Sequence, residues 1–95
     1  MSIEVKKITV DGVEFLIYEV DRSKGYPSGI TFECEHTRFS YALLERGGKR
    51  TLVPTFDPKK RISEVAFRAR GKMLNGIFGP EVEFYRKPKK VSHHH

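Results

Sequence analysis

Residues 6–20 read KKITVDGVEFLIYEV, and this stretch decides the class of fold. Two apolar runs, rich in β-branched and aromatic residues, flank the dipeptide Asp11-Gly12. Asp-Gly between such runs favours a two-residue type I′ turn, because both central residues of that turn need a positive φ. The stretch therefore predicts an antiparallel hairpin with strands at residues 5–10 and 13–20.

The next segment predicts a loop and a third strand. Residues 21–28 (DRSKGYPS) are rich in turn formers and predict an exposed loop. Residues 29–36 (GITFECEH) alternate between apolar and polar positions. On a strand, this alternation places one set of side chains on a single face, namely Ile30, Phe32, Cys34 and His36. We therefore predict that Cys34 is a buried core residue.

A second hairpin is predicted around Gly47-Gly48. Residues 38–45 have strand character, and the two glycines can adopt the positive φ of the corner. The chain is then expected to return through residues 50–53. Pro54 has no amide donor, so this strand should end there or lie at a sheet edge.

A helix is predicted over residues 58–75. Asp57 is a typical N-cap residue and Pro58 suits the first helical position, while Asn75-Gly76 is expected to end the helix. Between them, apolar residues recur at helical spacing: Ile62, Val65, Ala66, Ala69 and Met73. Residues 63–71 also alternate with period two, so a strand is the alternative.

These elements predict a single α+β domain over residues 1–90. Its antiparallel sheet has five to six strands, the last at 81–86, and is packed by one helix; an all-β barrel is the alternative. The segment 91–95 is a C-terminal tail whose three histidines are typical of a purification tag. A sheet covered on one face suggests a homodimer that hides edges or apolar surface.

Composition narrows the class of protein. The 95 residues are 38% hydrophobic and 32% charged, which is typical of a folded globular chain. No apolar run is long enough to span a membrane, and the N-terminal sequence MSIEVKK does not resemble a signal peptide. Cys34 is the only cysteine, so no internal disulfide can form. We therefore expect a cytoplasmic protein.

Few residues could support catalysis or metal binding. Cys34 and His36 are two residues apart, roughly 7 Å on a strand, too far for a nucleophile–base pair. Glu33 and Glu35 share the opposite face and are best explained as carboxylates on a solvated sheet face, or as cross-strand partners of Arg38 or Lys24. One cysteine and one histidine outside the tag cannot make a four-ligand zinc site. The sequence predicts a non-enzymatic protein without metal or cofactor.

The net charge of +6 is unevenly distributed along the chain. Residues 1–45 carry five Lys and Arg against eight Asp and Glu, whereas residues 46–95 carry thirteen against four. This asymmetry favours a basic surface that meets an anionic partner, although a solvated basic surface without a partner is the alternative.

The candidate interface combines these cations with aromatic rings. Arg61, Arg68 and Lys72 fall on one stripe of the predicted helix, whereas Arg70 lies at the edge of the apolar stripe and could be structural. Tyrosines on strands could stack unpaired bases, and the phenylalanines, Phe67 included, are predicted core residues. The predicted nucleic-acid-binding residues are Lys49, Arg50, Lys59, Lys60, Arg61, Arg68, Lys72, Arg86, Tyr41 and Tyr85.

Together these features predict a small basic protein that binds single-stranded DNA or RNA. The order of two hairpins and a helix is similar, by topological analogy alone, to single-strand-binding folds with a curved sheet and one packed helix. Reading of duplex DNA is not favoured, because the chain has one Asn and no Gln. The alternative is a protein-interaction module, an adaptor or small inhibitor, that uses a sheet edge or basic face against an acidic partner.

Overall fold

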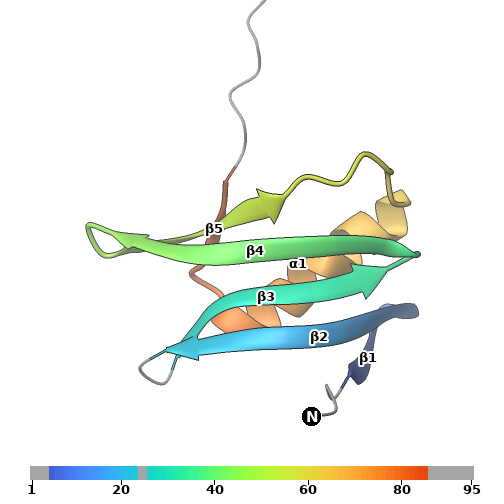
Figure 1. Cartoon of the computed structure of the whole chain (residues 1–95), viewed down its shortest axis with the longest axis horizontal. Helices are drawn as coiled ribbons and strands as arrows, with labels where there is room; N and C mark the ends of the chain where they lie inside the picture. The colour runs from blue at the N-terminus through green and yellow to red at the C-terminus, as the bar shows by residue number, and fades with distance from the viewer. Residues whose placement is uncertain (1–4, 24–25, 86–95) are drawn as a thin grey trace, which may run out of the picture.

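The computed structural model describes residues 5–23 and 26–85. The elements follow in the order β1 (Lys6–Val10), β2 (Val13–Ser23), β3 (Tyr26–Cys34), β4 (Thr37–Arg46), β5 (Lys49–Phe56), α1 (Glu64–Phe78) and β6 (Glu83–Phe84). The strands form one sheet in the order β1-β2-β3-β4-β5-β6, and α1 lies across one of its faces (Figure 1). The α+β class is therefore confirmed, and the sheet is open, not a barrel.

The sheet is mixed and not purely antiparallel. The first five strands form an antiparallel meander, but β6 pairs parallel to β5 through residues 51 and 52. The final strand is also shorter than the predicted 81–86. It is parallel because the chain crosses the sheet face as α1 before it returns to the edge beside β5. No helix among the described residues has the length and apolar character needed to span a membrane.

Within the described residues, three tight turns join neighbouring strands. The turn at Asp11 (φ 50°) and Gly12 (φ 78°) confirms the first predicted hairpin, and Gly47 (φ 59°) and Gly48 (φ 80°) confirm the second. A further turn at Glu35-His36 has φ values of 50° and 61° and joins β3 to β4. His36 therefore belongs to a turn and not, as predicted, to the core face of a strand.

The predicted loop at 21–28 is wrong over most of its length. Strand β2 continues to Ser23 and β3 begins at Tyr26, with Asp21 paired to Gly29 and Arg22 to Pro27. Pairing between two long neighbouring strands overrides the local turn preference of these residues. Gly29 is required in this register, because a Cβ there would lie 2.9 Å from the carbonyl oxygen of Tyr41.

The helix is confirmed, but it begins and ends later than predicted. Ser63, not Asp57, is the N-cap: its side chain accepts a hydrogen bond from the Ala66 N–H at 3.2 Å. Residues 57–63 are needed to carry the chain from the sheet edge to the helix layer. Gly76 stays within the helix because the next turn buries Phe78 in the core, and Gly79 (φ 105°) ends it.

The core lies between α1 and the sheet, and Phe32 is at its centre. The Phe32 ring is fully buried, with centroid distances of 6.0 Å to Phe15, 5.3 Å to Phe39 and 6.0 Å to Tyr41. Cys34 is buried beside this cluster, which confirms its predicted place. Burial raises the pKa of the Cys34 thiol to about 11, so the thiol is protonated at neutral pH.

Strand β5 lies at the sheet edge over its second half. The Tyr85 N–H donates to the Leu52 carbonyl at 2.9 Å, so the backbone of Leu52 faces away from β4. Pro54, two residues further on, has the same orientation and presents no N–H to the open edge. The strand continues to Phe56, which confirms the edge position, and the missing donor protects this edge from pairing with another strand.

Candidate functional site

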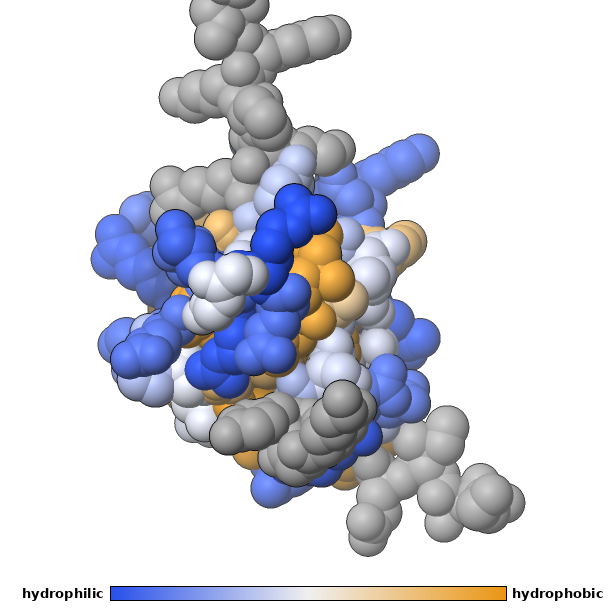
Figure 2. Space-filling model, turned by 90° about the vertical axis from the view of Figure 1, so that its left-hand side faces the viewer, coloured by the Kyte–Doolittle hydropathy of each residue, from blue (hydrophilic) through white to orange (hydrophobic). Residues whose placement is uncertain are grey.

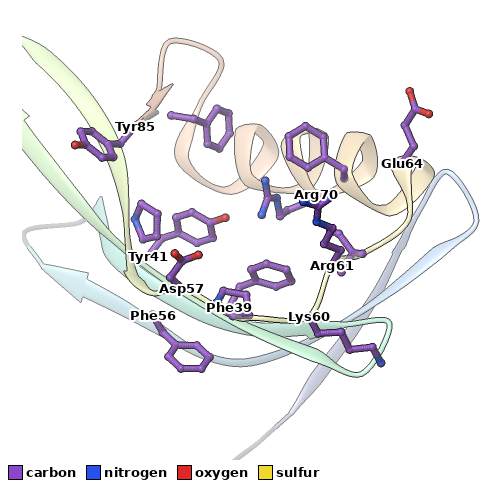
Figure 3. A pocket seen from close by; sticks show the side chains of 14 residues that line it. Phe39, Tyr41, Phe56, Asp57, Lys60, Arg61, Glu64, Arg70 and Tyr85 are labelled. Atoms are coloured by element: carbon purple, nitrogen blue, oxygen red, sulfur yellow. The ribbon is translucent and has the colours of Figure 1, made fainter. Parts of the chain in front are cut away.

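A groove of about 480 Å³ lies between helix α1 and strand β5 (Figure 3). The rings of Phe39 and Tyr41, from β4, form its floor. Phe67 and Arg70 line it from the helix, and Tyr85 lines it from the segment after β6. The loop that connects β5 to α1 completes the lining, so the groove exists only once the helix has packed on the sheet.

Arg70 is held among three rings at the base of the groove. Its guanidinium carbon lies 4.7 Å from the ring centroid of Phe67, 5.1 Å from that of Phe39 and 5.8 Å from that of Tyr41. A planar guanidinium stacks well on aromatic faces, and such contacts fix its orientation. The positive charge is therefore preorganised, which supports the structural role that the sequence suggested for Arg70.

The Tyr41 hydroxyl belongs to the same cluster. Figure 3 shows this hydroxyl directed toward Arg70. Burial raises the pKa of Tyr41, and the nearby Arg70 charge acts in the opposite direction. Because Tyr41 is buried beneath the groove, it cannot offer an open ring to a base, and its predicted stacking role is wrong. On β4 it shares the helix-facing side with Phe39, which explains the burial.

Two large rings remain open to solvent within the groove. Phe67 is 57% exposed and Tyr85 is 47% exposed, and both line the groove. The prediction that Phe67 is a core residue is therefore wrong. Phe56 is also a lining residue and is 53% exposed, so its prediction as a core residue is wrong too. Its ring points away from the groove in Figure 3, because the register of Phe56 with Ser40 places it on the opposite face of the sheet. The groove thus combines exposed aromatic surface with fixed positive charge.

Cations from the loop before α1 add to this charge. Lys60 and Arg61 both line the groove, and Figure 3 shows the Lys60 side chain extending outward at its rim. The Glu64 carboxylate points away from the groove and pairs with Arg68 at 2.8 Å. Glu64 therefore does not offset the positive charge inside the groove, whereas the Asp57 carboxylate, which also lines the groove close to Tyr41, offsets part of it.

Glu35 fastens this loop to the sheet. Its Oε1 accepts from the Ser63 N–H and its Oε2 from the Ser63 hydroxyl, both at 2.6 Å. The Lys60 Nζ also donates to the Glu35 carbonyl oxygen at 3.5 Å. The hydroxyl and amide of Ser63 lower the pKa of the Glu35 carboxyl. A carboxylate of the chain itself thus occupies the positive end of α1.

Replacing Glu35 by Gln is expected to lower the thermal unfolding midpoint at neutral pH. The native pKa lies below the ordinary value of 4.5, so ionised Glu35 stabilises the fold above that pH. This contribution is lost as the pH falls through the native pKa, and the wild-type and variant midpoints should then converge. Circular dichroism melts at pH 7 and in acid test this. Glu81→Gln, at an exposed position, is the matched control. A difference between the wild-type and Glu35→Gln midpoints that does not decrease in acid would contradict the prediction.

The structure brings together only part of the predicted interface. Lys60, Arg61 and Tyr85 line the groove, whereas Lys59 lies in the same loop without lining it. Arg61 precedes the helix, so the predicted stripe of Arg61, Arg68 and Lys72 does not form.

The other predicted cations lie elsewhere. Lys72 pairs with Asp11 at 2.6 Å on the helix surface, on the side of the first hairpin. Lys49 and Arg50 belong to the β4–β5 hairpin, where the Arg50 guanidinium lies beside Gly79. Arg86 lies outside the described residues. Charge placement along the sequence therefore identified the cationic residues but not the surface that they form.

Phe67 is the exposed groove ring that sequence reasoning missed, whereas Arg70 was considered as a residue that could be structural. One signal was available: Phe67 does not fall on the apolar stripe that Ala66, Ala69 and Met73 define. A large ring away from the buried face of a helix is more informative than a ring on it.

Comparison of the chain with protein-family models, curated proteins and solved structures finds no match. Within the described part of the chain, no group of three or more His, Cys, Asp or Glu side chains is placed to hold a metal ion.

Proposed function

We propose that the protein binds single-stranded DNA or RNA in this groove and does so without catalysing a reaction. The observation that carries the proposal is that two exposed rings, Phe67 and Tyr85, line the same groove as Arg61 and Arg70. Aromatic platforms next to cations are the common means of holding unpaired bases and their phosphates. A volume of about 480 Å³ is also within the range of ligand sites.

In this binding mode, a base stacks on the open face of Phe67 and a neighbouring base on Tyr85. Arg70 supplies a fixed charge beside them, and little side-chain entropy is lost because the three rings already hold it. Lys60 and Arg61 contact phosphates and release counterions. Every base has a π-face, so sequence preference should be weak.

The proposed setting is cytoplasmic. Cys34 is a free, buried thiol, and a free thiol suits a reducing compartment.

The alternative, a module that adds a partner strand to its sheet edge, is less favoured at β5. Pro54 removes a donor from the open part of that edge, which a pairing strand would need. A partner with an acidic peptide segment could also bind in the groove, and competition between such a peptide and the oligonucleotide tests this.

Replacing Lys60 and Arg61 together by Ala should flatten the salt dependence of oligonucleotide binding. Each lost phosphate contact reduces the slope of log affinity against log salt by about 0.7 for single strands, so the pair should remove about 1.4 units. Fluorescence anisotropy with labelled single-stranded and duplex oligonucleotides measures the slope, and an acidic peptide serves as competitor.

The matched control removes the same number of charges outside the groove. Arg68 and Lys72 pair with Glu64 and Asp11 on the helix surface, so their double Ala variant should keep nearly the full slope. No binding to any single strand at low salt would overturn the proposal. Equal slopes in the two double variants would show that the groove is not the site.

A further inference from the structure

The face of the sheet opposite α1 carries an apolar strip along β4 and β5. Leu43 and Leu52 are paired and face the helix, so their neighbours alternate to the open face. These neighbours include the Ala42–Val53 pair and Leu44, which is 55% exposed. In Figure 1 this face is turned toward the viewer, and α1 lies behind the sheet.

Two oppositely charged features flank the strip on the same face. The basic feature is the pair formed by Arg46 and Lys49 at the end of the β4–β5 hairpin. Figure 2 looks onto this end of the molecule, where hydrophilic side chains gather beside an apolar area. Side chains two residues apart on a strand share a face. Leu44 and Thr51 face outward, so Arg46 on β4 and Lys49 on β5 face outward as well.

The acidic feature is a hollow of about 220 Å³ around Gly29. The missing side chain of Gly29 opens it, and Glu19 and Asp21 line it from β2. The hydroxyls of Thr31 and Ser40, 3.0 Å apart, also line it. Within residues 5–23 and 26–85, neither of these two carboxylates has an ion-pair partner.

Leu44 lies midway between the acidic hollow and the basic end. Gly29 is opposite Ala42, and Lys49 is opposite Arg46; Leu44 is two residues from each of these β4 positions. From the strand rise and spacing, Gly29 and Lys49 each lie about 8 Å from Leu44, in opposite directions. Consider a two-fold axis that lies parallel to the sheet face, passes over Leu44 and is perpendicular to the line from Gly29 to Lys49. Rotation about this axis places Lys49 of each copy over the hollow of the other copy.

We propose that two copies of the chain pack their open sheet faces together as a homodimer centred on Leu44. The interface is isologous, so each copy provides both the acidic hollow and the cation that enters it. Contact between the apolar strips stabilises the dimer, and the opposite charges set its register. Both grooves remain on the outer sides of the dimer, so this proposal does not depend on the function of the groove.

The test is the molecular mass of the protein in solution, measured by light scattering and sedimentation across a concentration series. Wild type should be a dimer, and Leu44→Glu should weaken the dimer by about tenfold or more, because it opposes two charges at the axis. The matched control is Val65→Glu, at a 59% exposed apolar position on α1 outside the interface, which should leave the dimer unchanged. Circular dichroism checks that the variants are folded.

Charge reversal tests the register. Lys49→Glu should weaken the dimer, and Asp21→Lys in the same chain should restore it, because the isologous geometry brings these two positions together. A monomeric wild type at all concentrations would overturn the proposal. So would a dimer that tolerates Leu44→Glu, or one in which the double reversal is as weak as Lys49→Glu alone.

Discussion

Replacing Phe32 by Ala is expected to lower the free energy of unfolding by about 3–5 kcal/mol. The ring is fully buried and contacts three other aromatic rings, one on β2 and two on β4. Its removal therefore forfeits both buried area and ring–ring contacts and leaves a cavity that the sheet cannot collapse to fill. The total free energy of unfolding of a native protein is only about 5–15 kcal/mol, so the variant should be close to unfolding.

Urea unfolding followed by circular dichroism measures this loss. The matched control is Phe56→Ala, which removes the same ring from a position that is more than half exposed. That variant should change stability by only about 0.5 kcal/mol, as surface substitutions usually do. A similar loss in both variants would show that Phe32 is not the centre of the core.

The turns show which parts of the fold are readable from sequence. Asp11-Gly12 and Gly47-Gly48 were predictable because their residue types tolerate a positive φ. Glu35-His36 adopts the same backbone conformation, yet glutamate carries no such signal. There the turn is imposed by the pairing of β3 with β4, which is a property of the two strands and not of the turn itself.

The helix shows how tertiary structure overrides local signals. Its existence was predictable from apolar spacing, but Asp57 and Pro58 wrongly predicted that it begins at residue 58. The true cap, Ser63, is stabilised by Glu35, a residue 28 positions earlier in the chain. No local pattern encodes that contact, because it arises only when the β3–β4 turn and the loop before α1 meet.

The groove was the least predictable feature. Lys60, Arg61 and Tyr85 could be named as candidates from residue type and charge alone. Their assembly with Phe67 and Arg70 depends on the packing of α1 over β4, where Arg70 meets the rings of Phe39 and Tyr41. Contacts between residues this far apart in the sequence cannot be predicted from composition or periodicity.

Phe67→Ala is expected to weaken oligonucleotide binding by about 5- to 150-fold. Loss of one stacked base costs about 1–3 kcal/mol, and the expected range follows from that energy. Tyr85→Ala should have an effect of the same size if each ring holds its own base. Both rings are substantially exposed, so neither variant should lose much stability, and anisotropy titrations at fixed low salt measure the change directly.

Two further variants separate stacking from simple apolar contact. Phe67→Tyr keeps an aromatic face and should bind nearly as well as wild type, whereas Phe67→Leu keeps apolar bulk without a π-face and should resemble Phe67→Ala. Val65→Ala is the control, because Val65 is as exposed as Phe67 and lies on the same helix outside the groove. If Leu restores binding as fully as Tyr, the groove recognises apolar surface and not bases. Because neither substitution alters a charge, the salt slope should stay constant across this series, and the effect of the rings can be read independently of the effect of Lys60 and Arg61.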